Sequence, residues 1–459
     1  MHSPPTTLRR ALRLPDVVLF FIVAVVGLRW IATAAATGPS GLVLWLVALV
    51  TFFFPLGFAV IELASRRPEE GGIYVWAQQE FGDLTAFMTA WFYWVSNVVY
   101  MPGLLYFGAG NLLYAFGPRA QALGSNPSYF ILVAVCGLAL ACLLNTIGTG
   151  VGKWLSNLGG IATWIPAGIL IALGAVAFTQ FGSATPISSA TMVPHLDFNN
   201  ALLWSTIAFG FAGFEAASLM GGEIEDARRT VPKAIVISGV SIAAIYILGT
   251  LAVLVALPQA DVSGLSGILQ AIDHMASVTG WRAVTPAVAL LVALGSLGGS
   301  SAWLASTARL PFVAGIDRYL PPAFGKLHPR WGTPHVALAT QAAAAAVIAI
   351  LGQAGASVKG AYDALVALGV ITYFLPYLVL FAAYARAKGE LRTPGGRPAV
   401  LVLAFLGGAT TLIALVLAAV PPADADKTWA LAKVVGGTAV LAVVGAILYA
   451  RRRRDSVAV

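Results

Sequence analysis

The chain alternates between long apolar stretches and short polar segments that carry most of its charges. Uncharged runs extend over residues 84–118, 120–152, 154–194, 234–260, 283–308, 336–358 and 398–423. An α-helix needs about 20 apolar residues to cross a bilayer, and each of these runs is longer. The pattern therefore predicts an all-α polytopic membrane protein.

The apolar pattern divides the chain into about 12 transmembrane helices. They are expected near residues 16–37, 41–64, 84–116, 128–147, 154–180, 200–222, 233–257, 283–307, 335–352, 361–386, 398–420 and 430–450. This gives a tail at 1–15, five spans in 16–180, five in 200–386, two more in 398–450, and a basic tail at 451–459.

Lys and Arg residues predict how these spans are oriented. If both termini lie on one side, that side holds 21 of the 27 Lys and Arg; the other side holds five, and Arg29 lies within a span. Loops that stay in the cytoplasm carry the excess of positive charge. We therefore expect a multi-pass protein of the cytoplasmic (inner) membrane with both termini in the cytoplasm.

Composition and motifs narrow the class of function. Only 10% of the residues are charged, against about 25% in soluble proteins. The net charge of +8 falls in short loops between spans, which argues against a nucleic-acid partner. The spans hold no nucleophile, metal cluster or carboxylate pair of a catalytic kind, and no phosphate-binding GxxxxGK[ST] loop occurs. We expect no enzyme activity and no cofactor.

The sixth span, within residues 205–235, carries the strongest functional signal. Gly210 and Gly213 interrupt an apolar helix and are followed by Glu215 near mid-membrane depth. A charge inside a span costs a few kcal/mol or more, and irregular backbone survives there only where it lines a cavity. The segment is therefore a candidate substrate site, in which Glu215 either carries a proton or is a permanently ionised partner of Arg29 or of backbone amides.

The first span has a matching feature five spans earlier. Arg29 lies slightly past the midplane toward the outside, and an interruption is expected near Gly27. Two interrupted spans at corresponding positions are typical of inverted-repeat transporters. Arg29 could bind a substrate carboxylate, pair with Glu215, or reach water on the outer side. Glu62 and Arg309 are interpreted as caps or loop partners at span ends.

Four stretches, in order along nearly the whole chain, resemble signatures of the amino acid–polyamine–organocation permeases. They are FGFAGFE (209–215) with EIEDARRTVP (223–232), ELA (62–64) with PEEGGIYVW (68–76), GSLGG (295–299) leading to Arg309, and DRYLPP (317–322) with GTP (332–334). Within this superfamily the chain is most similar to the glutamate:GABA antiporter group, through FPLG (54–57), LYF (105–107), PGG (394–396) and PP (421–422).

This resemblance implies a LeuT-like fold of two inverted five-helix repeats plus two peripheral helices, with helices one and six broken. Phe209 resembles an aromatic gate, Gly210 and Gly213 the exposed backbone of the break, and Glu215 a carboxylate linked to proton dependence. Ser300 sits where related exchangers carry a helix-eight aromatic, and Tyr373 matches a tenth-helix aromatic. The expected substrate-binding residues are Gly27, Arg29, Phe209, Gly210, Gly213, Ser300 and Tyr373. Many members have Gly-Ser-Gly in the first break, where this chain has Ala24 to Val26.

The expected function is secondary active amino acid transport by alternating access, with a central site between spans one and six. A proton gradient or a counter-substrate would drive it, by symport or exchange, and its partners are an amino acid or amine substrate and the lipid bilayer. Two alternatives stay open: a permease-fold sensor or scaffold without transport, and a carrier for polyamines or other organic cations. The amino acid carried, a role for Na⁺ and the oligomeric state also stay open.

Overall fold

A computed structural model describes residues 10–68, 71–194, 198–263, 266–316, 320–353, 358–419 and 436–457. Over these residues the chain is helical, and the only β-type contact is a single bridge between Leu12 and Ile224. Eleven segments of this part of the chain are long and apolar enough to cross a membrane. The prediction of an all-α polytopic membrane protein is confirmed.

The eleven candidate spans follow the predicted ranges closely. They are built from α1 (Leu14–Val25) with α2 (Leu28–Ala35), α3 (Ser40–Ala48) with η1 (Leu49–Phe53) and α4 (Phe54–Arg66), α6 (Asp83–Leu112) with η2 (Leu113–Ala115), α8 (Pro127–Ile147), α9 (Thr149–Phe181), α10 (Phe198–Gly210) with η4 (Phe214–Glu223), α11 (Ala227–Ala256), α13 (Val284–Thr307) with α14 (Arg309–Ile316), α15 (His335–Gly352), α16 (Val358–Arg386) and α17 (Gly396–Ala418).

The remaining helices are short or lie at the chain end. They are α5 (Ile73–Phe81), α7 (Pro118–Gln121), η3 (Ala122–Ser125), η5 (Gln259–Asp261), α12 (Gly267–Val278) and α19 (Gly437–Val457). The apolar part of α19, Gly437–Arg451, is shorter than the eleven spans, and residues 430–435 of the predicted twelfth span lie outside the described residues. Helix α19 also continues through Arg451, where the sequence predicts a tail.

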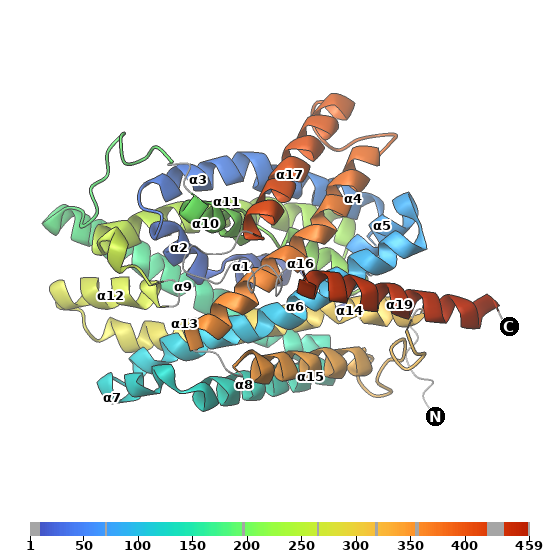
Figure 1. Cartoon of the computed structure of the whole chain (residues 1–459), viewed down its shortest axis with the longest axis horizontal. Coiled ribbons are helices and arrows are strands. Elements are labelled where there is room, and N and C mark those ends of the chain that lie inside the picture. The colour runs from blue at the N-terminus through green and yellow to red at the C-terminus, as the bar shows by residue number, and fades with distance from the viewer. Residues whose placement is uncertain are drawn as a thin grey trace.

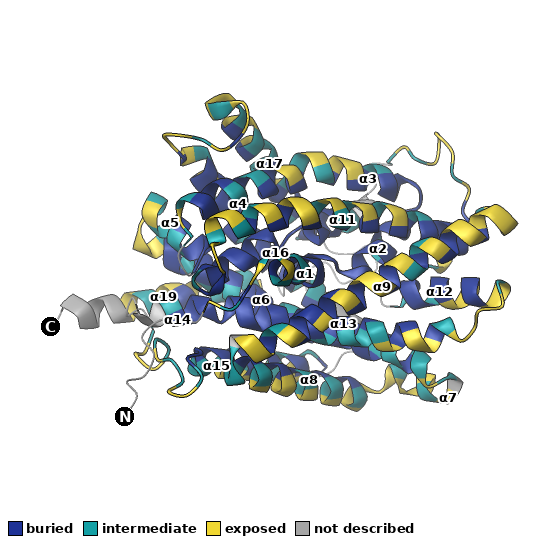
Figure 2. Cartoon of the chain, turned by 180° about the vertical axis from the view of Figure 1, so that it is seen from behind, coloured by how far each residue is buried: buried dark blue, intermediate teal, exposed yellow. Residues whose placement is uncertain are grey.

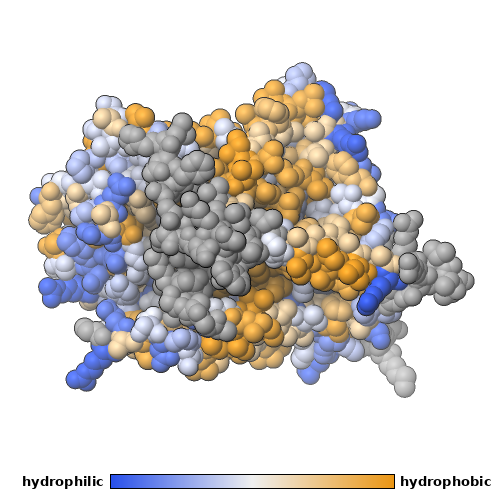
Figure 3. Space-filling view, in the orientation of Figure 1, coloured by the Kyte–Doolittle hydropathy of each residue, from blue (hydrophilic) through white to orange (hydrophobic). Residues whose placement is uncertain are grey.

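The helices run mostly along the long axis of the molecule, which is horizontal in Figure 1. In Figure 3, apolar residues lie to the right of and below the central atoms drawn in grey, and hydrophilic residues gather toward the two ends of the molecule. In Figure 2 the buried residues concentrate on the inner faces, and exposed ones lie along the outer helices. This distribution is the one a bilayer-spanning bundle requires, because lipid contacts the outer faces of the helices.

The first and sixth spans lie at the centre of the bundle and both are broken. Their most apolar windows are 83% and 89% buried, whereas the window of Gly396–Ala418 is 28% buried. Helix α1 stops at Val25, extended backbone follows at Val26 and Gly27, and α2 restarts at Leu28. Helix α10 stops at Gly210, and η4 begins at Phe214 after three residues without regular helix. Both predicted interruptions are present.

Close contacts between glycines bring the supporting helices together. A Cβ built on Gly298 of α13 would lie 2.4 Å from Cα of Gly159 on α9, and a Cβ on Gly159 would lie 2.6 Å from Cα of Gly298. Small residues at such a crossing let two membrane helices approach backbone to backbone. Helices α9 and α13 therefore form a tightly packed pair next to α1.

Candidate functional site

The hydroxyl of Tyr246, on α11, joins the two helix breaks. It lies 2.6 Å from the carbonyl oxygen of Val25 and 2.7 Å from that of Gly210, and it accepts a hydrogen bond from the Gly27 amide at 3.1 Å. A phenol carries a single hydrogen, so it donates to one of the two carbonyls at a time. One side chain therefore supplies backbone partners to both interruptions.

Two further side chains complete the hydrogen bonding of the broken backbone. The indole of Trp303, on α13, donates to the carbonyl of Ala24 at 3.2 Å. The Gly213 amide donates to the hydroxyl of Tyr377, on α16, at 3.0 Å. Gly213 has a φ of 130°, which glycine adopts without strain. The first break forms here without a Gly-Ser-Gly triplet, because side chains from neighbouring helices replace the missing helical hydrogen bonds.

Glu215 is fully buried in a cage of three tyrosines. Tyr373 donates to Glu215 Oε1 at 2.7 Å, Tyr377 donates to Oε2 at 2.6 Å, and Tyr93 from α6 also donates to Oε1. The hydroxyls of Tyr93 and Tyr373 lie 3.2 Å apart. Because Tyr377 also accepts from the Gly213 amide, the carboxyl group is linked through one hydroxyl to the second break.

A narrow inner cavity lies between the two breaks and next to this cage. Its lining residues are Ala24, Val25, Trp30, Asn97, Tyr100, Phe209, Ala212, Trp303 and Tyr373. All of them except Tyr100 are buried. Asn97 Oδ1 has no hydrogen-bond partner within the described part of the chain, although Asn97 Nδ2 donates to the carbonyl of Tyr93. The cavity thus offers aromatic walls and one acceptor oxygen.

A second, outer cavity shares three aromatic rings with the first. Trp30, Tyr100 and Phe209 line both, and Arg29 lines only the outer one. The ring of Phe209 contacts Trp30 and Tyr373 edge to face, with centroids 5.3 Å apart in each case. The three shared rings therefore separate the inner cavity from the space beside Arg29, and a gate role for Phe209 stays a prediction.

Both cavities are contracted in this conformation. Each has a volume of about 10 Å³, which is enough for about one water molecule. An amino acid is several times larger. The structure is therefore a closed state, in which the walls must move apart before a solute can enter.

Arg29 is 2% exposed, so it does not reach open water on the outer side. Its guanidinium lies 4.2 Å from the ring centre of Trp30 and 4.6 Å from that of Tyr100. Both oxygens of Glu215 accept from tyrosines, so the structure does not support direct pairing of Arg29 with Glu215. Arg29 thus lies beside the outer cavity, and its contact with a substrate there stays a prediction.

The other predicted site residues divide into two groups. Phe209 and Tyr373 line the inner cavity, whereas Gly27, Gly210 and Gly213 contribute backbone groups to the breaks. Ser300 is buried and lines neither of the two cavities, so its role in substrate binding stays a prediction. Trp303, about one helical turn further along α13, supplies the aromatic ring that lines the inner cavity.

Four important residues were not singled out from the sequence: Tyr93, Tyr246, Trp303 and Tyr377. Tyr373 and Tyr377 are four residues apart and so share one face of a helix, which was a usable signal. Tyr246 gave none, because a lone tyrosine in an apolar span is more often packing than a bridge. Among the described residues, no group of three or more His, Cys, Asp or Glu side chains could hold a metal ion.

Comparison with known proteins now identifies the family. A family model described as amino acid permease matches residues 12–444. The chain belongs to the amino acid permease family. An uncharacterized transporter of Legionella pneumophila is 29% identical over 425 residues, covering 91% of each chain.

Two named relatives and one solved structure extend this identification. A glutamate/gamma-aminobutyrate antiporter of Lactococcus lactis is 24% identical and covers 82% of this permease and 77% of its own length. A probable agmatine/putrescine antiporter of the same species is 25% identical over 78% of this chain and 75% of that protein. The crystal structure of MhsT with L-phenylalanine superposes with a TM-score of 0.66 at 16% identity, over 90% of this chain and 99% of MhsT. The permease therefore has the predicted LeuT-like fold.

Proposed function

We propose that this permease is a secondary transporter of the cytoplasmic membrane that carries an amino acid or a related amine by alternating access. The observation that carries the proposal is the pair of helix breaks that face a closed central cavity. Their backbone groups are held by side chains rather than by helix, so they can be exchanged for substrate contacts. Transporters of this architecture bind substrates at such breaks.

The inner cavity supports a small substrate with an amino group. The free acceptor Asn97 Oδ1 and the faces of five aromatic rings suit an ammonium group, which aromatic rings attract. Arg29, behind the shared rings, would attract a carboxylate when the wall opens. These features favour a zwitterionic or anionic amino acid.

A carrier for polyamines is the second candidate, favoured by a different observation. The aromatic walls and the buried carboxylate of Glu215 together resemble a cation site, and one relative is named as a probable agmatine/putrescine antiporter. Arg29 argues against it, because the guanidinium would repel a second positive group. The sensor or scaffold reading has no observation in its favour and predicts binding without exchange.

Glu215 is proposed to carry or sense a proton during the cycle. When ionised, it accepts hydrogen bonds from the tyrosine cage; when protonated, it must donate one, so a hydroxyl in the cage has to turn. Because Tyr377 also accepts from Gly213, this change would reach the break in the sixth span. A proton gradient or a counter-substrate would then drive the cycle.

Counterflow in proteoliposomes tests the proposal. The vesicles are loaded with unlabelled glutamate, gamma-aminobutyrate, phenylalanine, agmatine and putrescine. Each of these compounds is then added outside in labelled form, at pH 5.5 and at pH 7.5. Accumulation of one labelled class is expected and would name the substrate. Folded protein that accumulates none of the compounds would contradict amino acid or amine transport.

The proton role is tested in the same assay with Glu215→Gln. The variant is expected to lose the difference between the two pH values, while Glu225→Gln, which removes an exposed carboxylate just beyond η4, keeps it. If counterflow by Glu215→Gln depends on pH as it does in the wild-type protein, the proton role of Glu215 is contradicted. The proposal that the protein is a transporter would still stand.

A further inference from the structure

A second, strongly polar pocket lies at one end of the molecule, away from the central cavities. Its volume is about 380 Å³. The lining residues come from the end of α4, from α5, from the first turn of α11 and from the chain just after α16; they are Leu63, Ser65, Arg66, Arg67, Trp76, Gln79, Glu80, Arg228, Ala387 and Lys388. The pocket is therefore much larger than the central cavities and connects four elements that are distant in sequence.

The pocket carries an excess of positive charge. Arg66 is paired with Glu62 at 2.7 Å, and Arg67 donates to the neutral amide of Gln79. No carboxylate of the described residues lies within ion-pair distance of Arg67, Arg228 or Lys388. Glu80 is the single acidic residue of the lining. Three cations that have no acidic partner among the described residues surround this pocket, and they favour an anionic ligand.

Ser65, a lining residue of the same pocket, carries a buried hydroxyl. Ser65 is 6% exposed, and its Oγ has no hydrogen-bond partner in the described ranges. Buried polar atoms in folded proteins are almost always bonded to protein or to a bound molecule. Because the Ser65 hydroxyl has almost no accessible surface, the groups that face the pocket are its cations, and a phosphate oxygen would accept from the planar guanidinium of Arg67.

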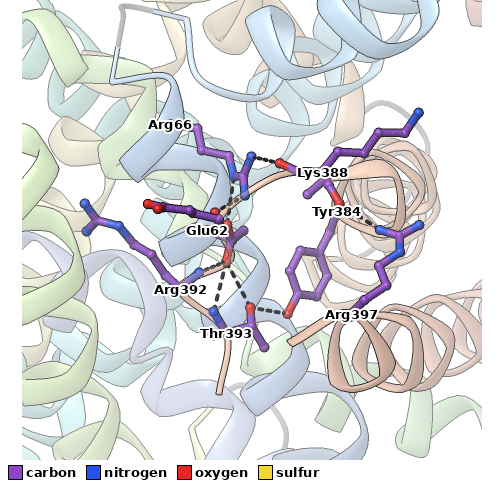
Figure 4. A network of polar contacts seen from close by, with 9 residues as sticks. Glu62, Arg66, Tyr384, Lys388, Arg392, Thr393 and Arg397 are labelled. Atoms are coloured by element: carbon purple, nitrogen blue, oxygen red, sulfur yellow. Dashed lines mark hydrogen bonds and ion pairs between the residues drawn. The ribbon is translucent and has the colours of Figure 1, made fainter. Parts of the chain in front are cut away.

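One wall of the pocket is held rigidly by the network in Figure 4. Arg66 donates to the backbone carbonyls of Lys388 and Glu390, while Glu62 Oε2 accepts from the amides of Arg392 and Thr393 at 2.8 and 3.0 Å. The amine of Lys388 points away from Glu62 in this view. The carboxylate thus neutralises Arg66 and fixes the loop, but it leaves the Lys388 charge for a ligand. Such preorganisation lowers the cost of binding.

We propose that this pocket binds the phosphate group of an anion, supplied either by the headgroup of an anionic phospholipid or by a soluble phosphate compound. The pocket lies at the end of the molecule where residues 11 and 12 bond to Glu223, the end that the charge distribution assigns to the cytoplasm. Anionic lipids of the inner leaflet attract Lys and Arg at this level. A bound phosphate ties α4 and α5 to α11 and α16, and so stabilises the conformation described here.

Two binding measurements on the purified full-length protein separate the two sources. Native mass spectrometry counts bound dioleoyl phosphatidylglycerol against dioleoyl phosphatidylcholine, and equilibrium binding of [³²P]phosphate is measured in neutral detergent. The test variant is Arg67→Gln/Arg228→Gln. Its matched control is Arg229→Gln, which removes a neighbouring cation that is 81% exposed and does not line the pocket.

Binding is expected to weaken about fivefold for each cation removed, and to stay unchanged in Arg229→Gln. Preference for phosphatidylglycerol that is lost in the double variant assigns a lipid headgroup; saturable phosphate binding without lipid preference assigns a soluble anion. Absence of both, or equal loss in Arg229→Gln, overturns the proposal. If the double variant does not fold, Arg67→Gln alone replaces it, and binding unchanged by Arg67→Gln counts against the site.

Discussion

At the scale of single residues, the hydroxyl of Tyr246 is expected to stabilise the backbone of both helix breaks. Tyr246→Phe removes the partner of the Val25 and Gly210 carbonyls but keeps the ring, which stacks on Trp45 with centroids 4.3 Å apart. Buried groups left without a partner cost about 1–3 kcal/mol. We expect lower thermal stability and slower counterflow. Tyr384→Phe, which removes a buried hydroxyl bonded to Thr393 near the end of α16, should leave transport unchanged. Equal transport by the two variants would refute the role of Tyr246.

Asn97 gives a residue-scale prediction in which stability and affinity change in opposite directions. Its Oδ1 is buried without a partner in the described structure, so Asn97→Leu removes an unsatisfied acceptor and should leave thermal stability equal or higher. The same change should raise the KM for counterflow about tenfold, because the substrate ammonium loses an acceptor. Ser96→Ala, next to it on α6, removes a hydroxyl that bonds to the Tyr93 carbonyl and is the control. A KM unchanged in Asn97→Leu would place the substrate elsewhere.

At the scale of elements, the crossing of α9 and α13 is expected to tolerate no side chain. A Cβ at position 298 would lie 2.4 Å from Cα of Gly159 and 2.8 Å from the Leu155 carbonyl. Gly298→Ala should therefore destabilise the protein by about 1–3 kcal/mol, as overpacking does. On the same α9 helix, a Cβ at Gly168 meets nothing within 4 Å, so Gly168→Ala should be neutral or stabilising. Equal melting temperatures of Gly298→Ala and Gly168→Ala in detergent would contradict this prediction, because they would show that α9 and α13 can move apart without loss of stability.

The elements also show how far the sequence alone could lead. Span positions and both breaks follow from apolar length, glycines and two charges at mid-depth, and these signals are local. The rotation of each helix is not local, because helices that are apolar all round show no preferred face. This is why the place of Trp303 in the wall of the inner cavity could not be predicted from its position in the eighth span. It is also why the tyrosines around Glu215, which come from two different helices, could not be assembled from the sequence.

At the scale of the whole molecule, the distribution of Lys and Arg and the positions of the chain ends both place the two termini on the same side of the membrane. The described chain begins and finishes at the same end of the molecule in Figure 1, and the sequence assigns 21 of 27 Lys and Arg to that side. Such a bias holds positive loops in the cytoplasm. Single cysteines placed at the two ends of the bundle can therefore read the orientation of the full-length chain, in a background without Cys136 and Cys142.

Val278→Cys, at the end of α12, and Glu390→Cys, after α16, mark opposite ends and are both exposed in the wild-type fold. A membrane-impermeant maleimide should label Val278→Cys on intact cells and Glu390→Cys only after permeabilisation. The physical reason is that moving the basic loops across the membrane costs more than leaving them where they are inserted. Labelling of Glu390→Cys on intact cells would show that the orientation is the opposite of the predicted one. The proposed phosphate-binding pocket would then lie on the outer face of the membrane. In that case an inner-leaflet lipid could no longer fill the pocket, whereas transport at the central breaks would be unaffected.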